Sequence, residues 1–311
     1  MVIGKIMNDI VSDIKSLELE TIKNLKNSKA NNTIRAYESD FRDFSVFCIK
    51  NGLNELPTEP KIISLYLTHL SKTSKFSTLR RRIASIKVIH KMKGHYLDSN
   101  HPIIMENLLG IKRIKGAYQK SKKPILINNL KDIIKALDEK EKNETKRIRN
   151  KSLILLGFAG GFRRSELVNI EHDDLEFVDE GLKILIKRSK TDQIGHGSLK
   201  AIPYFSNEKY CPVRKIKDWI KYRNIKEGKI YNISDKSVSL TLKKYALLAG
   251  LDPNLYGGHS LRSGFATTAA EAGAEERNIM AMTGHKTTQM VRRYIQEANL
   301  FKNNALNKIK I

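Results

Sequence analysis

Residues 257–294 read GGHSLRSGFATTAAEAGAEERNIMAMTGHKTTQMVRRY and combine helical patterns with cationic and polar residues. Helical patterns of apolar residues cover 260–272 and 275–282, and a third helical pattern follows them. His259 and Arg262 are one helical turn apart, so both side chains can face the same ligand. The stretch therefore predicts a helical segment that carries a group of cationic and polar side chains.

The chain before this stretch alternates between helical and strand-like patterns. Short runs with β-branched residues predict three strands, at 175–178, 182–186 and 199–203. The polar sequence KRSKTDQIGHGS between the last two strands predicts a hairpin loop. Helical patterns cover most of the rest of the second part. They lie at 129–141, 146–160, 209–225, 237–249 and 287–309.

The first part of the chain, up to about residue 110, contains only helical patterns. Thr33 is the expected N-cap of the first helix, because its hydroxyl can accept a hydrogen bond from the first turn. Pro60 fits the first turn of the second helix. The four helices are expected at 33–48, 60–70, 76–92 and 102–111.

The two parts are joined by a stretch without acidic residues, 107–130, which contains Gly116 and Pro124 and has little periodicity. Such a stretch is typical of a linker. We therefore expect a mainly α protein with a small antiparallel β-sheet. Its parts are expected to be an N-terminal helical domain at 1–113, a basic linker at 114–123 and a mixed α+β domain at 124–311.

The chain carries a large positive charge that is spread over both parts. Lys and Arg number 57 and Asp and Glu number 33, so the formal net charge is +24. Residues 1–123 hold 23 basic and 11 acidic residues and the remainder holds 34 and 22, a surplus of 12 in each part. Such a field predicts a polyanionic partner, with nucleic acid preferred over an anionic membrane. Because the parts share the charge equally, both are expected to touch that partner.

The helix expected at 76–92 is the best candidate for contact with phosphate groups. It lies within residues 60–97, which include nine basic residues and no acidic one. Its apolar stripe leaves several basic side chains on another face, which suits phosphate binding, although a merely solvated face is the alternative. The candidate DNA-binding residues are Lys75, Arg80, Arg81, Lys87 and Lys91, together with Lys112, Arg113 and Lys115 further along the chain.

Several classes of protein are disfavoured by what the sequence lacks. Cys48 and Cys211 are too few for a disulfide framework and fit a reducing compartment. The longest nearly apolar run, 152–162, is shorter than the ~20 residues of a membrane span, and charges interrupt the N-terminus where a signal peptide would be apolar. No zinc-site, P-loop or dinucleotide-binding pattern occurs. We expect a soluble cytoplasmic protein that needs no metal and no cofactor.

Six residues of the second part could carry chemistry, although each has an ordinary structural interpretation. Arg163 could simply start a surface helix, and Lys190 could be an unremarkable lysine at a hairpin tip. His259 could cap a helix, and Tyr294 could belong to the core. With their contexts, the six are Arg163 in GGFRRSEL, Lys190 in SKTDQ, His259 and Arg262 in GGHSLRSG, His285 in TGHK, and Tyr294 in MVRRYIQ.

The order and contexts of these six residues resemble the tyrosine recombinase (phage integrase) family. The segment TIRAYESDFRDFSVFC at 33–48 is similar to the opening helix of that family's N-terminal core-binding domain, and the basic linker falls where the family has one. The resemblance covers nearly the whole chain. It implies a SAM-like DNA-binding domain at 1–113, a catalytic domain at 124–311 and site-specific recombination of duplex DNA.

The resemblance also implies a role for each member of the set. Tyr294 would attack a DNA phosphate and form a 3′-phosphotyrosyl link. His259 would accept the tyrosine proton, and Lys190 would give a proton to the departing 5′ oxygen.

The two arginines suit the transition state, because forked guanidinium donors can bind two oxygens of a pentacoordinate phosphorus. Arg163 and Arg262 would form this clamp if they converge. His285 would donate a hydrogen bond to a non-bridging oxygen. Glu166 is expected either to orient the catalytic residues, as the resemblance implies, or to make a surface salt bridge.

Family members run the reaction in a tetramer on two DNA sites, through a Holliday junction. We therefore expect a monomer in solution, a homo-tetramer on DNA, and possible accessory or directionality proteins in the service of a mobile element or of chromosome maintenance. Only about 30 residues precede the core-binding pattern, as in the simple Cre-like and Xer-like members. An apolar stripe near the C-terminus is expected to dock into a neighbouring protomer, or alternatively to pack on its own domain: Leu300, Phe301, Ala305, Leu306 and Ile309.

Two other functions remain open from the sequence. A type IB topoisomerase also forms a 3′-phosphotyrosine, but it relaxes supercoils as a monomer. A DNA-binding protein that kept the fold without catalysis is the alternative from another class.

Overall fold

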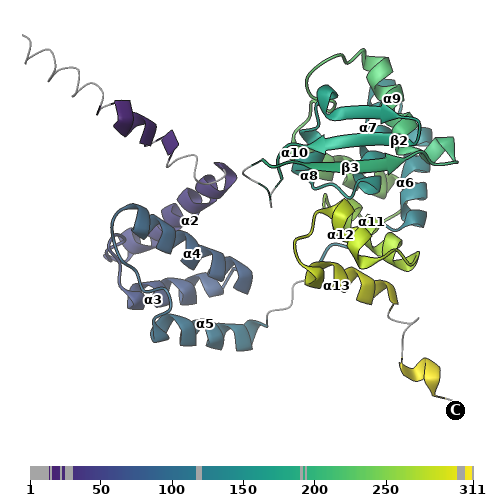
Figure 1. Ribbon diagram of the computed structural model, residues 1–311. Coiled ribbons are helices and arrows are strands. Elements are labelled where there is room, and N and C mark those ends of the chain that lie inside the picture. Colours follow the sequence, from purple (N-terminus) through teal and green to yellow (C-terminus); the bar gives the residue numbers. More distant parts are fainter. Residues whose placement is uncertain are drawn as a thin grey trace, which may run out of the picture. The chain divides into compact units, whose positions relative to one another are not determined.

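The computed structural model describes residues 14, 16–21, 23–24, 31–116, 121–189, 192, 195–299 and 305–309. The chain divides into two compact units between residues 120 and 121 (Figure 1). The described residues form helices and a single small antiparallel sheet, so the predicted fold class is confirmed. The domain limits at 113 and 124 stay predictions, and the division between the units falls inside the range expected for the linker.

The first unit is a helical domain around one apolar core. Its helices are α2 (Asn31–Lys50), α3 (Pro60–Ser71), α4 (Phe76–Met92) and α5 (Pro102–Lys115). Helix α4 buries Leu79, Ile83 and Ile86 at the spacing of an amphipathic helix, and they meet Phe44 and Leu67 in the core. Helix α5 continues to Lys115, four residues beyond the predicted end, and these four residues are exposed.

A buried carboxylate fastens α2 to α4 in this unit. Asp40, 2% exposed, accepts a hydrogen bond of 2.7 Å from the Ser85 hydroxyl. It also forms ion pairs with Arg81 and with Arg82, the latter at 3.2 Å. The negative charge can be buried because these partners replace its water.

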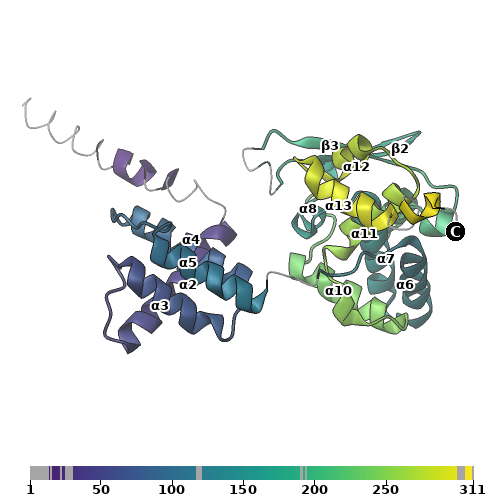
Figure 2. The same ribbon diagram turned by 90° about the horizontal axis from the view of Figure 1, so that it is seen from below.

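The second unit holds the remaining elements (Figure 2). Its α-helices are α6 (Ile127–Lys140), α7 (Glu144–Ala159), α8 (Arg164–Val168), α9 (Pro212–Arg223), α10 (Asp235–Leu248), α11 (Ser260–Glu271), α12 (Glu276–Thr283) and α13 (Thr288–Asn299). Its 3-10 helices are η1 (His172–Asp174), η2 (Glu208–Tyr210), η3 (Pro253–Leu255) and η4 (Ala305–Lys308). The strands, which lie where the sequence predicts them, are β1 (Leu175–Val178), β2 (Gly181–Ile186) and β3 (Ser198–Pro203).

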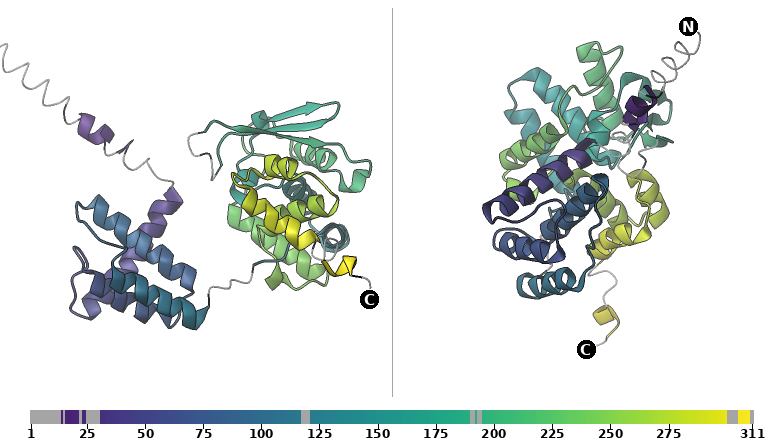
Figure 3. Two further views of the ribbon diagram at one scale, coloured as in Figure 1. Left: turned by 60° about the horizontal axis from the view of Figure 1, so that its bottom comes forward. Right: turned by 90° about the vertical axis from the view of Figure 1, so that its left-hand side faces the viewer.

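The sheet is antiparallel, in the order β1-β2-β3, and lies on one side of the helices of this unit (Figure 3). Leu182 is paired with Ile202 and Ile184 with Lys200, so these four residues share one face. That face is buried against the helices, and Lys200 is the polar member of the four. The pairing therefore carries a lysine into the interior of the unit.

Helix α7 is the central element of the second unit. Every residue from 152 to 159 is buried, so this half of the helix is covered on all sides, by α9, α11, α6 and α10. An apolar helix needs such complete cover. The chain then turns at Gly160 and Gly161, so this buried helix leads directly to the candidate residue Arg163.

The predicted helix at 287–309 is not continuous in the described residues. Helix α13 ends at Asn299, residues 300–304 lie outside the described part, and Ala305–Lys308 is a single 3-10 turn. Leu306 and Ile309 are 66% and 58% exposed. A short amphipathic helix gains most of its stability from burial of its apolar face, and these two side chains are mostly exposed.

Within the part of the chain that the structure describes, no helix has both the length and the apolar character that crossing a membrane requires.

Candidate active site

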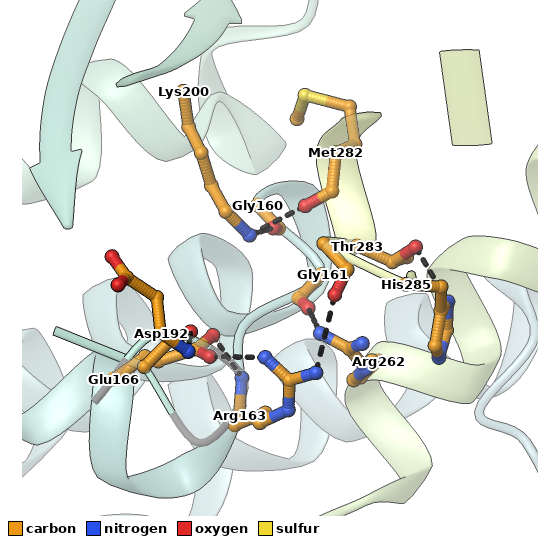
Figure 4. Close-up of polar contacts among 12 residues, drawn as sticks. Gly160, Gly161, Arg163, Glu166, Asp192, Lys200, Arg262, Met282, Thr283 and His285 are labelled. Atoms are coloured by element: carbon orange, nitrogen blue, oxygen red, sulfur yellow. Dashed lines mark hydrogen bonds and ion pairs between the residues drawn. The ribbon is translucent and has the colours of Figure 1, made fainter. Parts of the chain in front are cut away.

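A cleft of about 480 Å³ opens on the second unit, where the ends of four helices come together (Figure 4). Arg163 reaches it from the start of α8, and His259 and Arg262 reach it from the start of α11. His285 follows the end of α12, and Met290 of α13 lines another wall. Four of the predicted site residues therefore line the same cleft. The first of them, Arg163, and the last, His285, are 122 positions apart in the sequence.

Arg163 is held in place by Glu166. It is the N-cap of α8, and its backbone N–H donates to the Glu166 carboxylate at 2.9 Å while its guanidinium forms an ion pair with the same group. Its Nη2 donates to the carbonyl of Gly284 at 3.3 Å. Glu166 is 5% exposed, so it orients a neighbouring cation from the interior and is not a surface salt bridge.

Arg262 is a buried cation with spare donor capacity. The side chain is 1% exposed, and its Nη1 donates to the carbonyl of Gly161 at 3.0 Å. Its Nη2 is buried and has no hydrogen-bond partner among the described residues. Burial and the nearby Arg163 lower the pKa of Arg262 to about 10, which measures how poorly the charge is solvated. An anion that approached these two arginines would relieve that cost.

His259 and Tyr294 form the contact that matters most for chemistry. The Nε2 of His259 lies 3.1 Å from the Tyr294 hydroxyl. His259 stands at the N-cap position of α11 but makes no capping bond with its side chain. Tyr294 packs its ring on the small cluster around Ala266 and Ala270, so its body belongs to the core while its hydroxyl meets the histidine.

The environment keeps His259 neutral at pH 7. Burial lowers its pKa below the usual 6.5, and the nearby arginines, Arg262 first, act in the same direction. A neutral imidazole within hydrogen-bond distance of a phenol is suited to accept the phenolic proton. The geometry therefore supports a general base beside a nucleophile.

His285 completes the wall of the cleft. It follows Gly284, whose φ of 61° ends α12 in a left-handed conformation that glycine adopts without strain. His285 is 7% exposed, and its Nδ1 lies 2.7 Å from the Thr283 hydroxyl oxygen. Burial, together with Arg262 and Arg163, lowers the pKa of His285 to about 4.

Lys190 lies outside the described residues, so the structure says nothing of its position. Its described neighbours Ser189 and Asp192 exchange backbone hydrogen bonds of 3.0 and 3.1 Å. The Asp192 carboxylate accepts backbone hydrogen bonds from Gly195, His196 and Gly197 at 2.8–3.2 Å. At the base of the hairpin, Lys187 forms ion pairs with Glu171 and Asp174, which link the end of β2 to the segment before β1.

Lys200 is a residue beside the site that sequence reasoning missed. It is 5% exposed, and its ammonium group donates to the carbonyl of Gly160 at 2.7 Å and to that of Met282, and lies 4.4 Å from the centre of the Phe162 ring. Two of its N–H groups thus have carbonyl acceptors, and its charge lies over an aromatic ring. One signal was available, since strand alternation places Lys200 on the same face as Ile202.

Residues 123–125, near the start of the second unit, pack against the start of α11 and the segment before it. The backbone N–H of Ile125 donates to the carbonyl of Ser260 at 3.0 Å, and that of Lys123 donates to Leu255 at 2.8 Å. Gly264 makes room for this passage, because a Cβ at that position would lie 2.1 Å from the carbonyl oxygen of Ile125. The glycine of the LRSGFAT segment therefore serves packing at a point where any side chain would collide with backbone.

The candidate DNA-binding residues are all exposed in the first unit. Two of them have protein partners: Arg81 pairs with Asp40, and Lys115 donates to the carbonyl of Ser74 at 3.1 Å. Their role in DNA binding stays a prediction.

The comparisons with known proteins agree with this geometry. A model described as the phage integrase family matches residues 125–300. The integrase/recombinase XerD homolog of Selenomonas ruminantium is 40% identical over 98% of this chain and 93% of its own length. This chain belongs to the phage integrase family. It is a tyrosine recombinase, and the resemblance stated from the motifs is confirmed.

More distant members of the family show the same relation. A tyrosine recombinase of Agathobacter rectalis is 29% identical over 86% of both chains. The fold is shared with XerH site-specific recombinase bound to a palindromic difH substrate in a post-cleavage complex, with a TM-score of 0.66 and 17% identity over 93% of this chain and 85% of that one. It is also shared with a lambda integrase dimer bound to a core site, with a TM-score of 0.60 and 17% identity over 95% and 98%.

Proposed function

We propose that this phage integrase family member is a site-specific DNA recombinase that cleaves and rejoins duplex DNA through Tyr294. The observation that carries the proposal is the 3.1 Å contact between His259 Nε2 and the Tyr294 hydroxyl. His259 lines the same cleft as Arg262, whose Nη2 has no hydrogen-bond partner among the described residues. The base and the anion-binding group thus share one cleft, and the nucleophile contacts the base.

In the proposed reaction, neutral His259 takes the proton of Tyr294 as the phenolic oxygen attacks the scissile phosphorus. The bond from phosphorus to the tyrosine oxygen forms while the bond from phosphorus to the 5′ oxygen breaks. The 5′ oxygen leaves as a hydroxyl, with its proton supplied by Lys190, and the phosphate stays on Tyr294 as a 3′-phosphotyrosine. The number of phosphoester bonds is unchanged, so a second 5′ hydroxyl can reverse the step without an external energy source.

Arg262 and Arg163 are the proposed phosphate clamp. Nη1 of Arg262 donates to the carbonyl of Gly161, and Nη2, which has no partner among the described residues, would donate to the phosphate. Arg163 is fixed by Glu166 and needs no reorganisation when charge develops on phosphorus. Donors that are oriented in advance in a poorly solvated site stabilise a transition state most effectively. His285 is proposed to contact a non-bridging oxygen of the same phosphate.

Both units are proposed to bind the DNA. The surplus of 12 positive charges in each half and the exposed basic residues of α4 and α5 support contacts with phosphate groups along the duplex. Family relatives of known structure are described on recombination substrates, including the XerH post-cleavage complex and the lambda integrase core-site complex.

The assembly is proposed to be a homo-tetramer on two DNA sites, with strand exchange through a Holliday junction and a monomer free in solution. Leu306 and Ile309 are exposed in the single chain, which suits a contact with a neighbouring protomer better than packing on the same domain. The enzyme would act on nucleoid DNA in the cytoplasm.

A nicked suicide duplex tests the chemistry. Binding sites are first selected from randomised duplexes with the Tyr294→Phe variant, and a nick placed near the scissile phosphate then prevents religation. The wild-type enzyme is expected to form a covalent protein–DNA adduct, and Tyr294→Phe is expected to bind without forming one. Tyr96→Phe, at a side chain that is 87% exposed, is the matched control and should form the adduct normally.

Three outcomes would contradict the proposal. Absence of an adduct with wild type on its selected site favours a DNA-binding protein without catalysis. Supercoil relaxation without recombinant products favours a type IB topoisomerase. An adduct that persists in Tyr294→Phe means that another residue is the nucleophile.

A further inference from the structure

The two ring nitrogens of His285 have different surroundings. Nδ1 contacts the hydroxyl oxygen of Thr283 at 2.7 Å, which leaves Nε2 for the cleft that His285 lines (Figure 4). A neutral imidazole carries its hydrogen on one nitrogen only. The partner of Nδ1 therefore decides whether Nε2 is a donor or an acceptor.

The Thr283 hydroxyl has one hydrogen and two close neighbours. Its oxygen lies 2.6 Å from the carbonyl oxygen of Ile279 and 2.7 Å from Nδ1 of His285. A carbonyl oxygen can only accept, so an oxygen–oxygen contact of this length requires the hydroxyl hydrogen to lie between the two atoms. A threonine in a helix commonly donates to the carbonyl four residues back.

It follows that the threonine oxygen accepts from His285. With its own hydrogen directed at Ile279, the hydroxyl can offer only a lone pair to Nδ1. Thr283 is fully buried, so solvent does not compete for these bonds. Nδ1 must then carry the imidazole hydrogen.

We propose that Thr283 is a positioning residue that holds neutral His285 in the Nδ1–H tautomer, so that Nε2 becomes a donor to a phosphate oxygen only after it takes up a proton from solvent. The tautomer follows from the contacts alone. Its consequence for phosphate binding rests on the proposed function.

The charges around His285 oppose this proton in the free protein. Titratable groups face the ring from four elements: Arg163 at the start of α8, His259 and Arg262 at the start of α11, Lys200 on β3, and Tyr294 on α13. Asp235 of α10 lines the same cleft, where it pairs with Arg164 at 3.7 Å. An anionic phosphate in the cleft adds the negative charge that favours the imidazolium. Phosphate binding and proton uptake are therefore linked.

The tautomer is read directly from the nitrogen chemical shifts of His285 in the full-length protein at neutral pH. The signals of the eight histidines are separated in a long-range proton–nitrogen correlation spectrum, and His285→Gln identifies the one that disappears. We expect a protonated Nδ1 and an unprotonated Nε2 in wild type and in Thr283→Ser, which keeps the hydroxyl. In Thr283→Val the Nδ1 acceptor is lost, and the Nε2–H tautomer should appear. A wild-type spectrum with hydrogen on Nε2 overturns the proposal, whatever the valine variant does.

The coupling to phosphate is tested by the pH dependence of suicide-substrate cleavage. Wild type and Thr283→Ser need one more proton than Thr283→Val, whose Nε2–H can donate without uptake. The ratio of the valine variant's rate to the wild-type rate should therefore rise about tenfold for each pH unit above the pKa of His285 in the complex. A ratio that is constant from pH 6 to pH 9 overturns the coupling. Failure of the recombinase proposal itself would appear separately, as the absence of any adduct while the tautomer is as expected.

Discussion

The Nε2 of His259 lies 3.1 Å from the hydroxyl of Tyr294, although 35 residues separate the two in the chain. One side chain stands at the start of α11, and the other stands on α13, two helices later. Packing of α13 on α11 through the cluster of Ala266, Ala270 and Val291 sets this distance. A small apolar cluster thus aligns the proposed base and the nucleophile.

Replacement of His259 by Gln should slow cleavage of the suicide substrate by about 10²–10⁴, the range of a lost general base. In the proposed mechanism the neutral imidazole is the active form, and burial lowers its pKa below 6.5. Wild-type cleavage should therefore fall as the pH drops through this lowered pKa, and His259→Gln should lack this fall at acid pH. Single-turnover rates from pH 5 to pH 8 measure both effects. A fall at acid pH that persists in the variant would assign the titration to another group.

Replacement of Arg262 by Lys should reduce cleavage by about 10²–10³ with little loss of DNA affinity. A lysine cannot bond Gly161 and a phosphate oxygen with two forked donors at the same time. Arg164→Lys is the matched control, because Arg164 lines the same cleft but is exposed and pairs only loosely, at 3.7 Å, with Asp235. Equal rate losses in the two variants would argue against the clamp.

Replacement of Lys200 by Met should change how stability depends on pH. Burial lowers the pKa of Lys200 to about 8 from a reference of 10.5. Between these values the unfolded chain binds more protons than the folded one, so the free energy of unfolding rises with pH across this window. The full effect is about 3 kcal/mol. Urea unfolding of wild type at pH 8 and pH 10 should show this rise relative to Lys200→Met, and parallel pH profiles would contradict it.

The same variant should also lose activity, because Lys200 joins the Gly160 turn before Arg163 to the end of α12 before His285. Lys200→Arg keeps the charge but is bulkier and is expected to recover only part of the activity. A Met variant that is fully active at neutral pH would show that the two segments align without Lys200.

Replacement of Gly264 by Ala should destabilise the second unit by about 1–3 kcal/mol, since the new methyl group would meet the backbone at Ile125. Gly110→Ala is the control, because a Cβ on that helical residue meets nothing within 4 Å. It should be neutral or stabilising by up to about 1 kcal/mol. Thermal unfolding of both variants checks the contrast, which fails if Gly264→Ala melts like wild type.

Replacement of Arg80 by Ala should weaken binding to all DNA sequences alike and reduce the slope of log affinity against log salt by about 1. Arg80 is exposed on α4, whereas its neighbour Arg81 is already paired with Asp40. Met92→Ala, at a 64% exposed and uncharged position on the same helix, is the control and should leave the slope unchanged. An unchanged slope in Arg80→Ala would remove α4 from the DNA interface.

The fold class and the three strands could be predicted from the sequence, and both predictions are confirmed. The sequence also predicts six catalytic residues, four of which line one cleft while Tyr294 contacts His259. Short runs with β-branched residues predict β1 to β3, and the helices of both units carry their apolar residues at helical spacing. The site residues were identifiable because His259, Arg262, His285 and Tyr294 stand in short motifs with fixed neighbours. Helix ends differ from the prediction: α5 extends to Lys115 with an exposed last turn, and Ala305–Lys308 is a 3-10 turn where the sequence predicts the end of a long helix.

The contacts between the site residues could not be predicted from the sequence. No pattern indicates that Lys200 spans Gly160 and Met282, since those partners lie 40 and 82 residues away and meet it through packing of the sheet on the helices. The contact between His259 and Tyr294 likewise depends on how α11, α12 and α13 pack. The same holds for Nη2 of Arg262, which has no hydrogen-bond partner in the described part of the chain. Local sequence sets helix and strand patterns over a few residues, whereas hydrogen-bond partners and desolvation are set by elements distant in the chain. The proposed tautomer of His285 depends on both local sequence and tertiary structure. Its partner Thr283 is only two residues away, but the Thr283 hydroxyl is oriented by the carbonyl of Ile279 at the buried end of α12.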